Sequence, residues 1–387
     1  MSEYQYYEFA AVDGPVTEAE APYPYSVSSR AEITPRRWRN VYNFGDFHGS
    51  PIRMMEHYDA HVYVANWGTF QFMLAFPENL LPTDLLAPYL AEEWLTACER
   101  AGRTILCWCR ETEEPDDAWL EGEGMLDGLL PIREELLRGD YRALYLGWLA
   151  SQSWRGDVNE DGDDENRLQQ EPPVPPGLGE LTDAQEELAD RLRVDPDLVA
   201  AAASLDVPES DRQEQVEQAL DKLSRADMRE YLLRVAEGQG TRVSAELNRL
   251  VAPPVDVDAG RRCRMCELWE MANGIREERL RRQAEERDRE RHKREAERKA
   301  HLESLIARAD EVWREAEAMA ELKKSSAYDQ AAARLRDLRD AYALAGRSAE
   351  FRQRLEMFRQ EYARRPALLR RLSDLSATNG PLSQHGP

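Results

Sequence analysis

The segment from Ile275 to Ala300 limits what this chain can fold into more than any other stretch. It is almost entirely charged and contains neither glycine nor proline. Acidic side chains precede basic ones by four residues, a spacing that stabilises an isolated helix by about 0.2–0.5 kcal/mol for each pair. We therefore predict one solvated helix, about 39 Å long at 1.5 Å per residue, with a disordered segment as the alternative. The pairs are Glu277–Arg281, Glu278–Arg282, Glu285–Arg289, Glu290–Arg294 and Glu295–Lys299.

Apolar positions in this segment are too few for a helix that pairs with another helix. Leu280, Ala284, Ala296 and Ala300 form no heptad seam, which a two-stranded coiled coil requires. We expect the segment to be a spacer between two unlike parts of the chain, and not a place where chemistry occurs.

Charge is distributed unevenly along the chain. Residues 261–387 contain 29 basic and 23 acidic side chains, whereas residues 1–260 contain 22 basic and 51 acidic ones. An acidic body repels nucleic acids and anionic membranes, so neither is expected as a partner. The mildly basic C-terminal part would attract an acidic protein partner or the acidic body of a neighbouring copy.

Composition also indicates the compartment. No early segment has the basic, apolar and small-residue order of a signal peptide. The longest apolar run, 61–76, is interrupted by Asn66, Gly68 and Gln71, and is too short and too polar to cross a bilayer. Five cysteines in 387 residues do not make a disulfide scaffold. These observations predict a cytoplasmic protein without membrane contact.

Hydrophobic periodicity predicts an α+β fold for residues 1–153. Asn66-Trp67-Gly68-Thr69 reads as a hairpin turn, because Asn and Gly tolerate positive φ. Strands that form hairpins, with helices between them, favour an antiparallel sheet covered by helices. We predict strands at 4–12, 39–44, 61–65, 70–76 and 104–109, and helices at 54–58, 83–100 and 131–151.

A mostly α-helical C-terminal half is predicted to follow, with the long charged helix and a helical-hairpin bundle. Its boundaries come from shifts in charge, proline content and apolar spacing. The predicted segments are an acidic and proline-rich linker (154–180), a small helical unit (181–251), a second linker (252–274), the charged helix (275–300), a three-helix module (301–375) and a disordered tail (376–387).

The three-helix module rests on apolar residues at helical spacing. A continuous stripe runs from Leu302 to Ala320, a second helix opens near Ser326 and ends at Gly346, and a third opens at Ser348 and ends before Pro366. Tight turns between amphipathic helices are typical of tetratricopeptide hairpins. Only one such unit is visible, whereas repeat arrays need about three.

Several motifs resemble known proteins. MSEYQYYEF, VYNFGDFHG, YVANWGT and YLGWLA resemble an uncharacterised bacterial family of similar length. The stretch YDQAAARLRDLRDAYALAGRSAEFRQRLEMFRQEYARRPALLRRL resembles the C-terminal helical module of bacterial SWIM zinc-finger proteins. The zinc motif of those proteins needs C-x-C followed by C-x-H, and only Cys107-Trp108-Cys109 is present here. The resemblance therefore implies a shared helical module and no zinc finger, and it brings no activity that can be carried over to this chain.

Two groups of residues have the chemistry of metal ligands. Cys107 and Cys109 share a strand face, and Cys263 and Cys266 form a C-x-x-C, so that four thiolates could build a tetrahedral zinc site. Arg261, Arg262 and Arg264 would favour thiolates for redox chemistry at the second pair. Their distance along the chain favours structural roles instead.

The second group is the histidine cluster. His48, His57 and His61 fall close together, and the last two have H-x-x-x-H spacing. They lack the glutamate that metalloproteases use as a general base, and His61 should begin a strand. We therefore expect structural histidines. The segment from Asp157 to Leu168 copies the first half of a calcium loop but ends without its bidentate glutamate.

Partner contacts are predicted at two places. Aromatic residues of the N-terminal strands, Trp67 and Phe70 above all, are either core or a partner groove. The pairs Arg364-Arg365 and Arg370-Arg371 form a basic edge on the last helices. No phosphate-binding glycine motif and no nucleophilic-serine motif is present.

We therefore predict a non-enzymatic cytoplasmic adaptor without a cofactor. Its N-terminal domain and its C-terminal module would bind protein partners, with a neighbouring-gene product among the candidates. The alternative is a metal-binding enzyme or sensor that uses the histidines or the paired cysteines.

Overall fold

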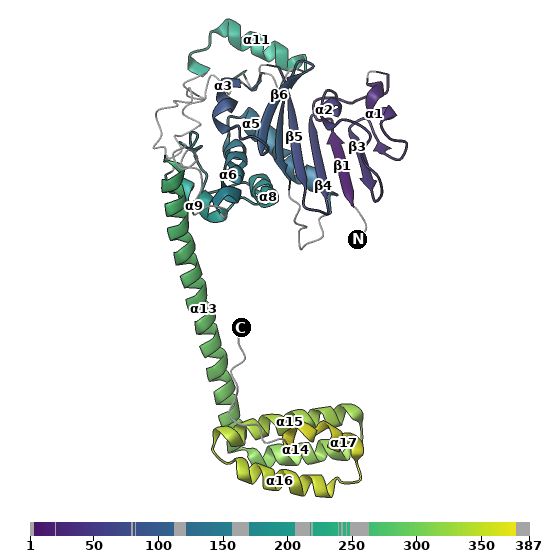
Figure 1. Cartoon of the computed structure of the whole chain (residues 1–387), viewed down its shortest axis with the longest axis vertical. Helices are drawn as coiled ribbons and strands as arrows, with labels where there is room; N and C mark the ends of the chain where they lie inside the picture. The colour runs from purple at the N-terminus through teal and green to yellow at the C-terminus, as the bar shows by residue number, and fades with distance from the viewer. Residues whose placement is uncertain are drawn as a thin grey trace. The chain divides into compact units, whose positions relative to one another are not determined.

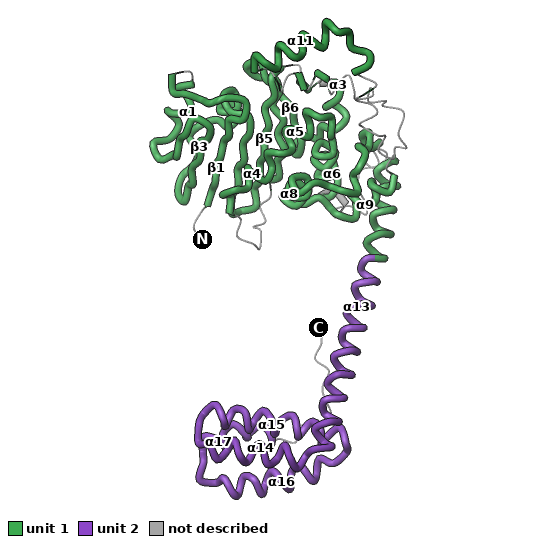
Figure 2. The backbone as a smooth tube through the Cα atoms, turned by 180° about the vertical axis from the view of Figure 1, so that it is seen from behind, with its two compact units in different colours: residues 1–278 green, residues 279–387 purple. Residues whose placement is uncertain are grey.

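The protein, as a computed structural model, divides into two compact units that we call unit 1 (residues 1–278) and unit 2 (residues 279–387). Figure 1 shows the elements along the chain, and Figure 2 shows the two units in different colours. The structure describes residues 4–19, 21–78, 80–81, 83–111, 121–156, 170–205, 217, 220–238, 240, 243–244, 246–247 and 263–376.

Unit 1 contains a seven-stranded antiparallel sheet, in the order β2-β3-β1-β4-β5-β7-β6. The predicted α+β fold, with its N-terminal antiparallel sheet, is therefore confirmed. The strands are β1 (Gln5–Ala10), β2 (Glu32–Ile33), β3 (Arg37–Tyr42), β4 (Ala60–Ala65), β5 (Phe70–Pro77), β6 (Leu95–Arg100) and β7 (Arg103–Arg110).

The turn between β4 and β5 is the predicted hairpin. The amide of Ala65 donates to the carbonyl of Thr69 at 3.0 Å. Gly68 has a φ of +96°, which glycine adopts without steric cost. The register Val64↔Phe70 follows from this turn.

The helix predicted at 83–100 is wrong in its second half. A short helix, α3 (Thr83–Leu86), and a 3₁₀ turn, η1 (Ala87–Tyr89), are followed by β6. Pro88 has no amide hydrogen to continue the helix. Leu95 is fully buried beside exposed Thr96, which is the two-residue alternation of a strand.

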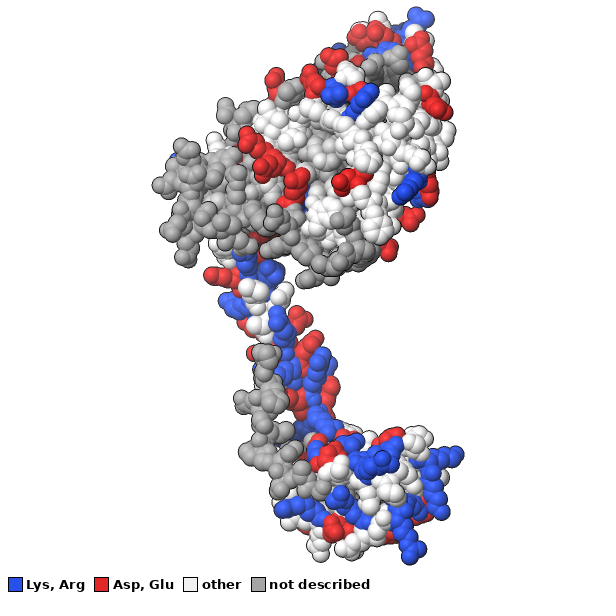
Figure 3. Space-filling view, turned by 45° about the vertical axis from the view of Figure 1, so that its right-hand side comes forward, with Lys and Arg blue, Asp and Glu red and all other residues white. Residues whose placement is uncertain are grey.

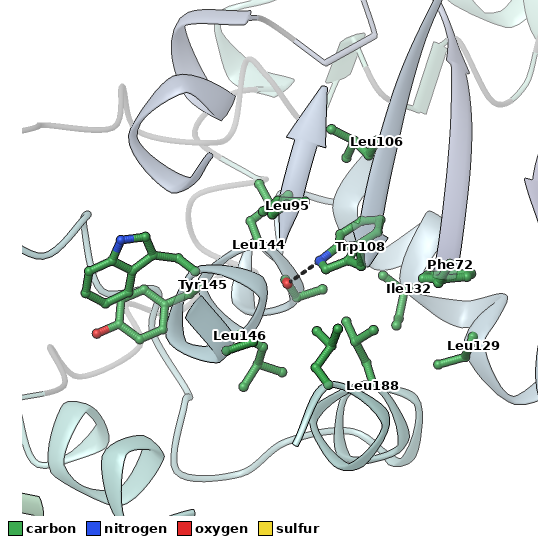
Figure 4. Close-up of a cluster of buried hydrophobic side chains, with 14 of the residues drawn as sticks. Phe72, Leu95, Leu106, Trp108, Leu129, Ile132, Leu144, Tyr145, Leu146 and Leu188 are labelled. Carbon is green, nitrogen blue, oxygen red and sulfur yellow. Dashed lines mark hydrogen bonds between the residues drawn. The ribbon is translucent and has the colours of Figure 1, made fainter. Parts of the chain in front are cut away.

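Helices cover one face of the sheet (Figure 1). Trp108 of β7 is fully buried beneath them, and its Nε1 donates to the carbonyl of Ala143 at 3.0 Å (Figure 4). The helix predicted at 131–151 is two helices, because Gly139, at a φ of +85°, ends the first. The covering helices are α4 (Met125–Leu129), α5 (Pro131–Leu137), α6 (Arg142–Gly156), α8 (Asp183–Leu192) and α9 (Pro196–Ala203).

The other face of the sheet is covered most fully over β1, β3 and β4, and the cover reaches Met73 and Ala75 of β5 and Ile105 of β7. Helices α1 (Pro22–Ser26) and α2 (Pro51–Met54) contribute to a second buried cluster there. Trp38 and Phe9 lie at its centre, with ring centroids 5.6 Å apart. This smaller cluster leaves Gln71 of β5, Cys109 of β7 and Thr96 of β6 half-buried or exposed.

The core of unit 1 extends beyond the predicted boundary at residue 153. Leu188 of α8 and Leu198 of α9 belong to the same buried cluster as the sheet, as do Met265 and Leu268. Helix α13 (Met265–Ala307) thus begins ten residues before the predicted start at 275. Its first turns are anchored by burial, and the charged segment is helical.

The proline-rich stretch predicted as an exposed linker is partly buried. Glu171 is only 1% exposed. Its carboxylate accepts hydrogen bonds from the amide of Cys263 at 2.6 Å and from the hydroxyl of Tyr145 at 2.9 Å. These contacts hold the stretch between α6 and the residues that precede α13. Most of the acidic stretch (157–169), much of 204–262 and the tail (377–387) lie outside the described residues. Within the second of these ranges the structure describes α11 (Arg225–Ala236).

Unit 2 is a helical bundle with its own core. Leu335 and Leu338 are fully buried at its centre, and Trp313 packs against Phe351 with ring centroids 5.7 Å apart. The predicted continuous stripe is divided at Arg308, where α13 ends and α14 begins. The elements are α14 (Ala309–Glu321), α15 (Ser325–Leu344), α16 (Ser348–Glu361), α17 (Pro366–Arg371) and the 3₁₀ turn η2 (Ser373–Ser376).

Candidate interaction surfaces

The three histidines do not converge on one position. His48 is exposed and His57 is half-buried, whereas His61 is completely buried in β4. His61 Nδ1 lies 2.8 Å from the carbonyl oxygen of Glu8, and its ring stacks on Phe9 at 4.0 Å. Burial lowers the pKa of His61 to about 3, so the imidazole is neutral at physiological pH. These contacts are those of a core residue.

The cysteine pairs lie on opposite sides of the sheet. Cys107 packs against the cluster that contains Trp38. Cys263 lies beside Glu171 and Tyr145, at the start of α13. A four-thiolate zinc site that joins both pairs is therefore not formed.

The two cysteine thiols of β7 are weaker acids than exposed thiols, because they are buried. Burial raises the pKa of Cys109 to about 11 and raises that of Cys107 further. Both are thiols at neutral pH, which makes them poor nucleophiles. Within the part of the chain that the structure describes, no three His, Cys, Asp or Glu side chains gather as metal ligands do. The calcium-like segment lies outside that part.

Of the two aromatic residues predicted to bind a partner, only one reaches the surface. Phe70 is 1% exposed and belongs to the main core of unit 1, so that prediction is wrong. Trp67, in the hairpin turn, is half-buried. Phe70 faces inward because it begins the alternation that also buries Phe72.

The predicted basic edge of unit 2 is half occupied by intramolecular contacts. Arg365 donates to the carboxylate of Glu321 at 2.8 Å, and Arg371 donates to the hydroxyl of Ser325 at 2.7 Å. Arg364 and Arg370 are exposed. Two guanidinium groups of the four thus remain oriented to solvent.

A half-exposed surface without charge lies over β5, β7 and β6. Strand register places Tyr63, Gln71 and Cys109 in one row across β4, β5 and β7. The next row contains Cys107 and Thr96 beside buried Met73, and Cys98 follows on β6. We call the six half-buried or exposed residues of these rows the open face: Tyr63, Gln71, Thr96, Cys98, Cys107 and Cys109. Each is half-buried or exposed, and none carries a formal charge at neutral pH.

The open face was not predicted as a surface. Its signal is the two-residue period of β4 and β5, in which Tyr63 and Gln71 alternate with buried neighbours. Phe72 and Trp108, on the covered face of the same strands, are fully buried. The open face lies beside Met73, Ala75 and Ile105, which the cluster that contains Trp38 buries on the same side of the sheet.

A groove of about 560 Å³ lies within unit 2, where α13 meets the end of α15. Arg298 fixes one wall, because it donates to Asp337 at 2.8 Å and to Asp340 at 3.0 Å on α15. The groove is lined by Arg287, Glu290, Arg291, Arg294, Glu295, Arg298, Lys299, Leu302 and Leu344. We call this the basic groove.

None of the helices in the described part of the chain has an apolar stretch of the length that a membrane span needs. No protein-family model, no curated protein and no solved structure matches the chain. The resemblance to the SWIM zinc-finger proteins therefore stays a prediction.

Proposed function

We propose that this protein is a cytoplasmic, non-enzymatic adaptor that binds protein partners. The observation that carries the proposal is the open face of unit 1. It presents Tyr63, Gln71 and Thr96 as hydrogen-bonding groups on a rigid sheet, next to the thiols of Cys107 and Cys109. The centres of protein–protein interfaces are depleted of charge and enriched in tyrosine.

The open face carries no charge, whereas the unit around it is strongly acidic. Residues 1–278 contain 55 acidic and 26 basic side chains. A surface without charge in such an acidic unit costs little desolvation when a partner covers it, since no ion has to leave water. The acidic surroundings would keep nucleic acids and anionic membranes away.

Rigidity supports the same role. Tyr63 is stacked on Tyr7 with ring centroids 4.4 Å apart, and its hydroxyl donates to Gln5 at 3.4 Å. A side chain that is already ordered loses little rotamer entropy on binding. The open face is thus suited to recognition of a preformed surface.

Affinity capture with the full chain tests this proposal. Thr96→Lys places one positive charge on the open face at an exposed position, and should strongly reduce retention of the partner. Ser29→Lys adds the same charge at an exposed position elsewhere in unit 1, and should retain it. If no protein is retained in stoichiometric amount, or if both variants retain it equally, the proposal fails.

A further inference from the structure

The basic groove of unit 2 is built from one face of α13. Arg287, Arg291, Arg294 and Arg298 recur at spacings of four, three and four residues, which align on one side of a helix. Leu302 continues this row by four further residues and reaches the bundle, where it is 8% exposed. A row of cations therefore ends at an apolar position.

The floor of the basic groove offers apolar contact. Leu344, at the end of α15, is 46% exposed although it lies beside Leu302 in the groove lining. The aliphatic stems of arginine side chains also cover apolar surface. A ligand that fills this groove would bury Leu344 and the stems together.

Arg298 is held by Asp337 and Asp340, but the cations farther along α13 are weakly engaged within the chain. Arg291 pairs with Asp288 at 2.9 Å and Arg294 with Glu290 at 3.5 Å, with side chains 60% and 80% exposed. Such exposed pairs contribute little to stability, so a ligand can replace them. Figure 3 shows the Lys and Arg side chains along α13 and over the bundle, with Asp and Glu side chains between them.

We propose that the basic groove binds an acidic amphipathic helix of a protein partner. Five basic and two acidic side chains line the groove, and Arg298 is already held by Asp337 and Asp340. Carboxylates on one face of a helix would complement the remaining row of Arg287, Arg291 and Arg294. A leucine at the end of the partner helix would pack on Leu302 and Leu344, as in other helix-in-groove complexes. The proposal deepens the adaptor role, but it does not depend on the open face.

A nucleic acid is the less suitable occupant. Glu290 and Glu295 lie between the arginines along α13, so a ligand has to place its negative charges opposite the arginines alone. A helix does so with spaced carboxylates, whereas a nucleic acid carries a charge at every phosphate. Leu344 offers an apolar contact that phosphate and ribose do not use. The observations therefore favour a protein segment, and nucleic acid becomes an outcome of the test.

Fluorescence anisotropy with the full chain tests the groove directly. The probe is a labelled helical peptide with glutamates at i, i+4, i+7 and i+11 and a leucine at i+15. The triple variant R287E/R291E/R294E should weaken binding by about tenfold or more, because attraction becomes repulsion along the row. Binding should also weaken as salt is raised, since salt screens exposed charges.

The control has the same change in charge outside the groove. R281E/R289E/K293E replaces three exposed cations of α13 that do not line it, and should bind the peptide within about twofold of the unchanged protein. Equal weakening in both triple variants would overturn the proposal. So would tighter binding of a single-stranded or duplex oligonucleotide than of the peptide. Loss of open-face capture in the Thr96→Lys variant leaves this result unaffected, so the two proposals fail separately.

Discussion

Gly147 sets how closely helix α6 approaches the sheet. A Cβ atom at this position would lie 2.8 Å from Cδ1 and Nε1 of Trp108 and 3.1 Å from Leu95. Trp108 cannot easily move, because its indole donates to Ala143 on the preceding turn of α6. Gly147→Ala should therefore lower the free energy of unfolding by about 1–3 kcal/mol, as measured by urea denaturation.

Gly274→Ala is the matched control, since it lies in α13 within the same unit and nothing lies within 4 Å of its added Cβ. It should leave stability unchanged or raise it by up to about 1 kcal/mol, because alanine favours the helix. If both variants behave alike, the close packing of α6 on Trp108 is wrong.

The pH dependence of stability should report the burial of His61. Its pKa falls from 6.5 to about 3 because folding removes the ring from water. Between these two pH values the unfolded chain binds a proton that the folded chain does not, so the free energy of unfolding falls as pH is lowered from about 6.5. Urea denaturation at pH 7, 6 and 5 measures this slope.

His61→Gln removes the titrating ring and offers a side-chain amide to the carbonyl of Glu8. Its stability should decline less steeply with acidification than that of the unchanged protein. Parallel slopes for the two proteins would show that His61 is not the group responsible.

At the residue scale, the sequence predicted which residues share a face of the sheet, but not which face is covered. The shared face of Cys107 and Cys109 follows from the two-residue period alone, and the structure places them so. Whether that face or the face of Phe70 is covered depends on helices α4 to α6, which follow later in the chain. Local sequence does not contain that information.

At the scale of elements, the sequence pattern predicted correctly the elements that are stabilised by interactions between nearby residues. The charged segment of α13 is helical, and the predicted pairs Glu285–Arg289 and Glu290–Arg294 lie at 3.8 Å and 3.5 Å. Strand β6 was missed because its conformation depends on pairing with β7, and the helix-favouring residues Ala91, Glu92 and Glu93 precede it. Long-range pairing overrode local propensity there.

Circular dichroism of a peptide that covers residues 275–300 tests the charged helix as an element. We expect a clear helical signal at low salt, because the i,i+4 ion pairs support it. The signal should decrease at about 1 M salt, where screening acts over a few ångströms. Negligible helix at low salt would mean that this segment needs its neighbours in order to fold.

At the scale of the whole molecule, the sequence indicated the α+β N-terminal part and the helical C-terminal part, but not where unit 1 ends. Leu188, Leu198 and Met265 join the core of the sheet from segments predicted to be separate. Their apolar spacing predicts helices, whereas the surface against which each helix packs is a long-range property. The open face and the basic groove arise from the same packing.

Thiol footprinting of the full chain tests the proposed adaptor role most directly. Cys98, Cys107 and Cys109 lie on the open face, whereas half-buried Cys266 lies at the start of α13. Alkylation is followed by mass spectrometry with and without the captured protein. We predict that the bound protein slows labelling of Cys98 and Cys109 several-fold and leaves Cys266 unchanged. Unchanged labelling of the three open-face thiols, while the protein is bound, would contradict recognition through this face.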